Sequence, residues 1–397
     1  MSSVGDALAR SRVAVAATFS AHAVIAGTVG PWIPRVKADA GLDAGGLGIA
    51  LAGYALGLVA GTRVAGPALR RVGARPTVRV GIPLLAAALA ALPAAGGLGA
   101  LVAIFGVLGV ASGALDVAMN SEAVEVERRA GRRLMSGMHG MWSVSMLVGA
   151  GLASIAIAID VPIEAYLPAL AAALVVASFP VLRWLPSPHE PERDEPVPDA
   201  VSPAGSSIAR VFVLCLIAFA SFMTEGIAAE WSAVYLHETL GATAGVAGLG
   251  VVAFSAGMAA SRFVGDRLAT RVGPRDLVRV GTAVSATVLA VALVVGGIPL
   301  TIAALAVVGI GVGPTVPMAF GAAGRVVLGP GRTALGIAVT AGYVGSIVGP
   351  LAMGFVADVS SLTASFAIPV TACVVVAIAA DALRVRADRR GGPTMRS

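Results

Sequence analysis

Residues 71–115 read RVGARPTVRVGIPLLAAALAALPAAGGLGALVAIFGVLGVASGAL, a basic loop followed by a run without any Asp, Glu, Lys or Arg. The uncharged run begins at Val80 and is long enough for two membrane-spanning helices, since one span needs about 20 apolar residues. Further uncharged runs cover residues 134–159, 280–324 and 333–357. They are apolar on every face, whereas the strands of a membrane barrel would alternate apolar and polar positions. The sequence therefore predicts helices that cross a lipid bilayer.

The composition of the 397-residue chain also indicates that much of its surface faces lipid. Hydrophobic residues make up 57% and charged residues 13%, which leaves too little charge to cover a soluble core of this size. Prolines, glycines and charged residues divide the chain into twelve predicted spans. These lie near residues 13–33, 45–69, 78–97, 100–124, 135–158, 165–184, 210–236, 244–268, 278–297, 299–324, 334–357 and 364–383. We predict an all-α polytopic membrane protein with twelve transmembrane helices.

The basic loop returns 200 residues later in the chain. RVGAR at 71–75 corresponds to RVGPR at 271–275, and the flanking residues keep the same register. Arg10 aligns with Arg210 in that register, so the first predicted span has a counterpart in the seventh. A charged loop repeated in one register indicates a duplication, and an even number of spans per half gives parallel halves related by an axis along the membrane normal. We therefore predict two pseudo-symmetric six-helix bundles.

Proline-rich, acidic sequence separates the two halves. We place the first half at residues 1–185, a cytoplasmic linker at 186–208, and the second half with a basic tail at 209–397. The linker has almost no large apolar side chain, which predicts disorder, and the tail is expected to lie at anionic headgroups. The alternative for the N-terminus is a secretory signal, with Arg10 and Arg12 before its apolar run. The repeat argues against removal of that segment, because the seventh span would then lose its counterpart.

The basic residues give an expected orientation. If the N-terminus is inside, every Lys and Arg except Arg35 and Lys37 falls in a cytoplasmic segment or the cytoplasmic half of a span, as the positive-inside rule requires. Both termini are then cytoplasmic, and the expected location is the inner (plasma) membrane of a bacterium. This asymmetry also explains the net charge of +6, so no nucleic-acid partner is expected. Cys215 and Cys373 lie in apolar runs as packing residues, and we predict no disulfide, metal site or cofactor.

A polar stripe lies on the fourth predicted span. Asp116 and Asn120 are four residues apart, and Ser112 is one turn before them, so all three share a helix face. A charge at mid-membrane costs about 2.5–3.5 kcal/mol on insertion scales, so such residues usually mark ion or substrate paths. We predict that Asp116 takes and releases a proton, and that Asn120 bonds either form of it or a substrate hydroxyl. The alternative is that the pair joins neighbouring helices by interhelical hydrogen bonds.

The seventh span carries two further acids, Glu225 and Glu230. Glu225 is expected near mid-depth and is a second candidate for proton coupling. Glu230 and Trp231 are expected nearer the outer surface, where tryptophan is common at the interface, and both are candidates for the substrate cavity. His22, near the middle of the first span, is a candidate proton partner for either Asp116 or Glu225 because its ordinary pKa lies near neutrality.

Other polar side chains in the spans have a structural alternative. His139 and Trp142 of the fifth span are cavity candidates, Trp142 by stacking on a sugar or aromatic ring, but helix packing is the interpretation that we favour for both. Arg262, near the cytoplasmic end of the eighth span, is expected to snorkel and to pair with Asp266 one turn on.

The loop residues Arg71, Gly73 and Arg75, and in the second half Asp266, Arg271, Gly273 and Arg275, sit where the major facilitator superfamily carries its signature loop. The usual acidic position is Arg70 in the first half and Thr270 in the second, which departs from the pattern. The stretches LDVAMN (115–120), GMHGMWS (137–143) and EGIAAEW (225–231) look like the MosC-like bacterial branch, close to the fucose permeases. The resemblance covers nearly the whole chain. It implies that the first, fourth, seventh and tenth helices line a central cavity.

The residues and the resemblance together predict a secondary active transporter that moves a small polar solute, such as a sugar or sugar-like compound, by alternating access. A proton is the expected coupling ion, with sodium left open, and the protein is expected to act as a monomer in the bilayer. Proton-coupled efflux of a drug or metabolite is the alternative within transport. A non-transporting membrane sensor or scaffold is the alternative outside it. The sequence has no HExxH pair, P-loop or Gly-x-Ser-x-Gly elbow, so an enzyme is not expected.

Overall fold

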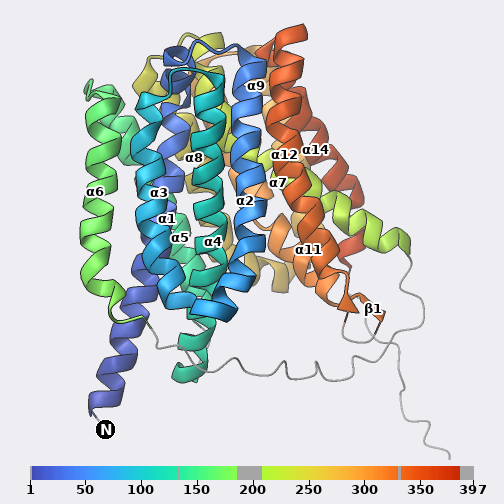
Figure 1. The fold of residues 1–397 in the computed structure, drawn as a ribbon. Helices are drawn as coiled ribbons and strands as arrows, with labels where there is room; N and C mark the ends of the chain where they lie inside the picture. The colour runs from blue at the N-terminus through green and yellow to red at the C-terminus, as the bar shows by residue number, and fades with distance from the viewer. Residues whose placement is uncertain (1, 132–133, 186–207, 330–331, 385–397) are drawn as a thin grey trace, which may run out of the picture.

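The computed structural model describes residues 2–131, 134–185, 208–329 and 332–384. Almost all of this part is helical, and twelve helices are long and apolar enough to cross a membrane. They stand side by side across the molecule (Figure 1). The prediction of an all-α membrane protein with twelve spans is confirmed. The predicted linker up to residue 207 and the tail beyond Arg384 lie outside the described residues.

The first six spans precede the linker. They are α1 (Ser2–Asp39), α2 (Ala44–Val72), α3 (Ala74–Ala91) with the 3₁₀ turn η1 (Leu92–Ala94), α4 (Leu98–Ala130), α5 (Met135–Ala158) and α6 (Ile163–Leu182). The second six follow it. They are α7 (Ile208–Val234) with the π turn η2 (Tyr235–Thr239), α8 (Ala244–Val272), α9 (Pro274–Val295), α10 (Ile298–Val312) with α11 (Thr315–Gly324), α12 (Leu335–Val359), and α13 (Leu362–Ser365) with α14 (Ala367–Ala379) and η3 (Ala380–Leu383).

Two short elements break this pattern in the second half. The tenth span divides into α10 and α11 at Gly313 and Pro314, because proline has no N–H to continue the helical hydrogen bonds. Strands β1 (Val327–Gly329) and β2 (Arg332–Thr333) pair antiparallel between α11 and α12.

The duplication is visible in the backbone as well as in the residues. Helices α2 and α8 both contain 29 residues, with bounds that differ by the offset of the repeat. Gly73 and Gly273 end them with the same φ of 84°, and their N–H groups donate to Leu69 and Ala269. Only glycine adopts such a φ without steric cost. The two bundles therefore share loop conformation at the repeated basic loop.

Helices α2 and α4 approach each other backbone to backbone. A Cβ atom at Gly109 of α4 would collide with the carbonyl oxygen of Tyr54, and one at Gly113 with that of Leu58. The second half repeats the contact, since a Cβ atom at Gly309 would collide with the carbonyl oxygen of Phe254. Small residues allow this approach where lipid provides no hydrophobic drive between helices.

We expect Gly109→Ala to lower the melting temperature of the purified protein, because forcing one methyl into a packed interface costs about 1–3 kcal/mol. Gly151→Ala on α5 is the matched control, since no atom lies within 4 Å of a Cβ atom there. Alanine is the better helix former by up to about 1 kcal/mol, so this control should melt at the same temperature or higher. Scanning fluorimetry in detergent measures both, and equal melting temperatures would contradict the close approach of α2 and α4.

Two polar contacts join the bundles at the end of the molecule opposite the start of α1. We call the end with the start of α1 and the β1 hairpin the terminal end, which is at the bottom of Figure 1, and the opposite end the distal end. At the distal end, Nζ of Lys37 donates to both carboxylate oxygens of Glu238 at 2.8 and 2.6 Å. The N–H of Gly45 donates to Oδ2 of Asp358 at 2.8 Å. These bonds link α1 with η2 and α2 with α12.

Candidate functional site

Polar contacts connect α1, α2, α4 and α5. Nε2 of His22 lies 2.7 Å from Oγ of Ser112, and the hydroxyl of Tyr54 lies 3.2 Å from the same Oγ. Nε1 of Trp142 donates to Nδ1 of His22 at 3.0 Å. His22 and Ser112 are buried. The structure thus brings together three predicted site residues, His22, Ser112 and Trp142, and adds Tyr54.

These contacts assign the protonation of the His22 ring. The indole N–H of Trp142 can only donate, so Nδ1 of His22 accepts and carries no proton. The ring proton is then on Nε2 and is donated to Ser112. A charged imidazole would place its Nδ1–H against the indole N–H. His22 is therefore neutral in this conformation, and it can take up a proton only after Trp142 moves away.

Asp116 and Asn120 face each other on α4. Nδ2 of Asn120 donates to the backbone carbonyl of Asp116 at 2.8 Å and to its Oδ1 at 3.2 Å. Both residues are half-buried. Both hydrogen bonds stay within α4, whereas the alternative interpretation expects this pair to bond to neighbouring helices. Among the described residues, Asp116 takes part in no ion pair. It acts electrostatically on Tyr54 of α2 and Tyr343 of α12, one from each bundle.

Helices α7 and α8 contribute a charged pair. Nη2 of Arg262 lies 3.7 Å from Oε2 of Glu225, an ion-pair distance too long for a good hydrogen bond. The same guanidinium lies over the Trp142 ring at 6.0 Å from its centroid. Nη1 donates to Oγ of Ser143 at 3.5 Å. The predicted partner of Arg262 is Asp266, whose side chain lies outside the described residues; among the side chains that are described, the carboxylate paired with Arg262 is that of Glu225.

Trp142 connects these two groups of polar residues. Its N–H binds His22 of the first bundle, and its ring face meets Arg262 of the second. A continuous line of contacts therefore runs from Tyr54 through Ser112, His22, Trp142 and Arg262 to Glu225, and it crosses the boundary between the bundles.

Several buried polar atoms have no hydrogen-bond partner among the described residues. They include Oε1 of Glu225, Oε2 of Glu230 and Nε1 of Trp231. Trp231 is completely buried in the core. Buried polar atoms are nearly always paired with protein or water. The unpaired oxygens of Glu225 and Glu230 therefore mark places for water or a polar solute.

His139 has a different environment. It is exposed on α5, and its ring meets Phe19 edge-on at a centroid distance of 5.5 Å. Arg262 acts on it electrostatically. The Phe19 contact is the one expected of a packing residue.

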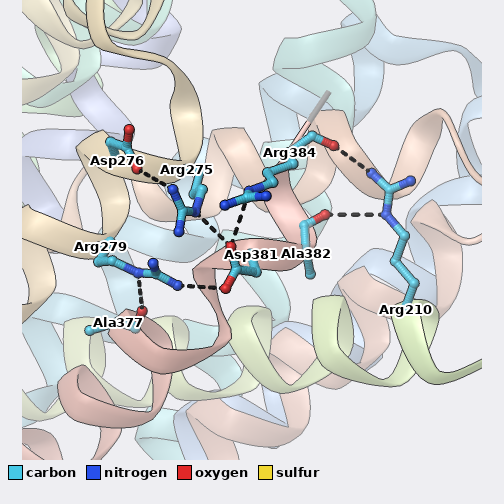
Figure 2. Close-up of polar contacts among 8 residues, drawn as sticks. All are labelled: Arg210, Arg275, Asp276, Arg279, Ala377, Asp381, Ala382 and Arg384. Atoms are coloured by element: carbon cyan, nitrogen blue, oxygen red, sulfur yellow. Dashed lines mark hydrogen bonds and ion pairs between the residues drawn. The ribbon is translucent and has the colours of Figure 1, made fainter. Parts of the chain in front are cut away.

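The repeated basic loops tie each bundle together at the terminal end. Nη2 of Arg75 donates to the carbonyl of Arg183 at 2.6 Å, so the loop after α2 holds the end of α6. Arg275 pairs instead with Asp276 and Asp381, which holds η3 (Figure 2). Arg71 and Arg271 are exposed.

Sequence reasoning missed Tyr54, Tyr343 and Glu122. Glu122 is a buried acid on α4 that interacts electrostatically with Arg75 and Arg129. A signal for Tyr54 exists in the repeat, because its counterpart is Phe254. The same offset pairs His22 with Phe222, and Ser112 with Val312. Positions that are polar in one bundle and apolar in the other would have pointed to this site.

We expect Arg262→Gln to lower the melting temperature, because Glu225 would lose its counter-charge in a half-buried place. Adding Glu225→Gln should recover part of the loss, with a coupling of about 0.5–3 kcal/mol, as for residues in direct contact. Arg267→Gln, at an exposed position of the same helix, is the matched control and should have little effect. Additive effects of the two substitutions in fluorimetry would mean that the pair does not interact.

The chain matches known transporters along almost its whole length. The family model of the Major Facilitator Superfamily matches residues 15–235 and 214–394. The uncharacterized transporter y4wD of Sinorhizobium fredii is 32% identical over 376 residues, covering 93% of this chain and 97% of the relative. An uncharacterized MFS-type transporter of Yersinia pestis is 30% identical over 357 residues, covering 89% and 90%. The membrane protein MosC of Rhizobium meliloti is 27% identical over 366 residues, covering 92% and 88%.

Solved structures share the fold. The nucleoside transporter NupG superposes with a TM-score of 0.74 at 13% identity, covering 95% of this chain and 99% of that one. The D-xylose-proton symporter gives 0.70 at 15% identity, covering 94% and 95%. The fucose:proton symporter FucP of E. coli gives 0.58 at 16% identity, covering 94% and 98%. The predicted resemblance is confirmed, and the chain is a multi-pass membrane transporter of the Major Facilitator Superfamily rather than an enzyme.

Proposed function

We propose that this transporter couples the movement of a small polyhydroxylated solute, of the sugar or nucleoside kind, to the movement of a proton. The observation that carries the proposal is Asp116, a half-buried carboxyl whose hydrogen-bond partner is an amide and which pairs with no cation among the described residues. Such a group is far less costly in the membrane when neutral than when charged. It therefore gains a proton easily when its surroundings close and releases it when water returns.

The side chains of the candidate site suit a solute with several hydroxyl groups. Asn120 offers both a donor and an acceptor, and the hydroxyls of Tyr54 and Tyr343 offer the same from the two bundles. The ring of Trp142 supplies an apolar face of the kind on which sugar and base rings stack. NupG, the D-xylose-proton symporter and FucP are named for solutes of this class, which supports the proposal through a shared fold.

The distribution of basic residues supports cytoplasmic termini in a bacterial inner membrane. The distal end is then external, and Lys37 with Glu238 closes it. We infer that this conformation faces the cytoplasm. Solute and proton would exchange with the interior here, and the outward-facing state would require these distal bonds to break.

Transport in proteoliposomes tests the proposal. The purified chain is reconstituted in vesicles with an alkaline interior, and uptake of radiolabelled D-xylose, L-fucose and uridine is followed. We expect at least one to accumulate above its external concentration and to leak out after addition of a protonophore. Accumulation that follows a sodium gradient and ignores the protonophore would overturn proton coupling. Binding of these solutes without flux would favour a sensor, and extrusion against the gradient would favour efflux.

A further inference from the structure

Three aromatic rings from three helices meet in the second bundle. The ring centroid of Phe222 on α7 lies 5.9 Å from that of Phe320 on α11, with the ring planes 37° apart. It lies 6.0 Å from that of Tyr343 on α12, with the planes nearly perpendicular at 78°. The Phe222 ring packs over Gly342, where a Cβ atom would meet it at 3.0 Å. We call Phe222, Phe320 and Tyr343 the aromatic cluster.

The aromatic cluster lies toward the first bundle. Its member Tyr343 interacts electrostatically with Asp116 of α4. All three rings are half-buried, so protein covers only part of their surface. Among the described residues, no guanidinium lies over any of them, whereas one lies over Trp142 and another over Trp184. The aromatic cluster therefore has ring surface that a solute can cover.

The repeat relates the aromatic cluster to the polar residues of the first bundle. In the 200-residue register, Phe222 stands where the first half has His22, and Phe320 stands where it has Asn120. Parallel halves are related by an axis along the membrane normal, so equivalent positions face that axis from opposite sides. The two bundles therefore present different walls, one that forms hydrogen bonds and one that is aromatic.

The two walls suit different parts of a solute. The side-chain N–H groups of Asn120 are used on Asp116 within α4, which leaves its carbonyl oxygen to accept from a hydroxyl. Phenylalanine offers neither a donor nor an acceptor, and burying a hydroxyl without a hydrogen bond is costly. A free sugar has hydroxyls all around its ring and would leave some of them unpaired against Phe222 and Phe320. A flat heteroaromatic ring has no such groups on its faces and stacks on aromatic side chains.

We propose that the aromatic cluster binds the base of a nucleoside, while Asp116 and Asn120 bind the hydroxyls of its sugar. This inference rests on the proposed function, within which it names the nucleoside rather than the free sugar as the solute. Aromatic rings pack best offset-stacked or edge to face. The tilted and the perpendicular ring of the aromatic cluster offer a planar base both arrangements. A base alone or a pentose alone engages only one of the two walls.

Isothermal titration calorimetry of the full-length protein in detergent tests the inference with uridine, uracil, D-ribose and D-xylose. We expect uridine to bind roughly tenfold more tightly than any of the other three, and this comparison needs no variant. Phe320→Leu removes a ring but keeps an apolar side chain. It should weaken uridine binding roughly tenfold, the effect of losing one stacking partner of a base, and leave D-ribose binding unchanged. Phe320→Tyr keeps the ring and should keep the affinity. Phe355→Leu is the matched control, since Phe355 is 68% exposed on α12, and it should bind all four compounds as the unmodified protein does.

The outcomes separate this inference from the proposed function. Binding of D-ribose or D-xylose as tight as that of uridine would overturn the inference and leave proton-coupled transport of a sugar standing. Equal binding of uracil and uridine would overturn it in favour of an aromatic solute without hydroxyls. An equal loss of uridine and D-ribose binding in Phe320→Leu would also overturn it, because the ring would then only support the fold. If none of the four bound and none accumulated in vesicles, the inference and the proposed function would both be wrong.

Discussion

Asp116→Asn is expected to abolish solute accumulation driven by a pH gradient while solute exchange continues. Asparagine resembles the neutral, protonated carboxyl in size and hydrogen bonding but can carry no proton. One pH unit corresponds to 1.36 kcal/mol, so a gradient of about two units supports roughly 100-fold accumulation when one proton moves with each solute. In the variant the ratio should fall to one. Uptake in proteoliposomes with an alkaline interior measures the ratio, using a solute found in the reconstitution described above.

Two comparisons make this result specific to Asp116. Glu164→Gln removes an exposed carboxyl from the first turn of α6 and should leave the accumulation ratio intact. Exchange of labelled for unlabelled solute without a gradient should keep its rate in Asp116→Asn. If the variant still accumulated solute, and Glu225→Gln instead lost accumulation, the proton would be carried by the second bundle and our assignment would be wrong.

The second large effect is expected where the bundles are joined. Glu238→Gln removes the carboxylate that pairs with Lys37. Only 9% of Lys37 is exposed, so water can replace that partner only in part. The pair is partly buried, because the side chains of Lys37 and Glu238 are 11% and 32% exposed. Losing one partner should then cost about 2 kcal/mol, between the values for exposed and for buried ion pairs. Applied only to the state in which the distal end is closed, this loss changes the ratio of the two states roughly 30-fold. The variant should therefore populate a conformation with a separated distal end.

Distances between spin labels measure this change. Labels at Glu164 and Ser360, both exposed at the distal end of different bundles, should move apart in Glu238→Gln after Cys215 and Cys373 are replaced. The charge swap Lys37→Glu with Glu238→Lys should restore the short distance. Arg35→Gln is the matched control, because it removes an ion pair within α1 that is largely exposed, and such pairs contribute 0–1 kcal/mol. An unchanged distance in Glu238→Gln would show that other contacts close this end.

The sequence was sufficient for the spans, the repeat and part of the site. Charged residues mark the ends of spans, and glycines allow the tight turns between them. Both signals are local, so the turns at Gly73 and Gly273 could be located from the residues alone. Asp116, Asn120 and Ser112 share a face by helix geometry, which needs no knowledge of neighbours. In contrast, the contact of His22 with Ser112 depends on how two apolar helices are rotated against each other. Helices that are apolar on every face give no periodicity from which that rotation could be inferred.

Lys37 illustrates what pattern alone could not explain. Lys37 is one of the two basic residues expected on the outer side of the membrane, and no acidic residue near it in sequence explains its position there. Its partner Glu238 lies at the same end of the molecule, in the other bundle. The contact of Arg262 with Glu225 has the same origin, because helix packing and not sequence order brings these two residues together. Pairings across a helix boundary are decided by the whole bundle.

Trp142 lies where its fluorescence would report the conformational changes of transport. The indole touches His22 in one bundle and Arg262 in the other, and indole fluorescence depends on just such polar and charged neighbours. The other tryptophans are Trp32, Trp184 and Trp231. With these three changed to phenylalanine, intrinsic emission would follow the separation of the bundles in real time. Unlabelled compounds could then be screened in solution by the shift in tryptophan emission wavelength that they cause.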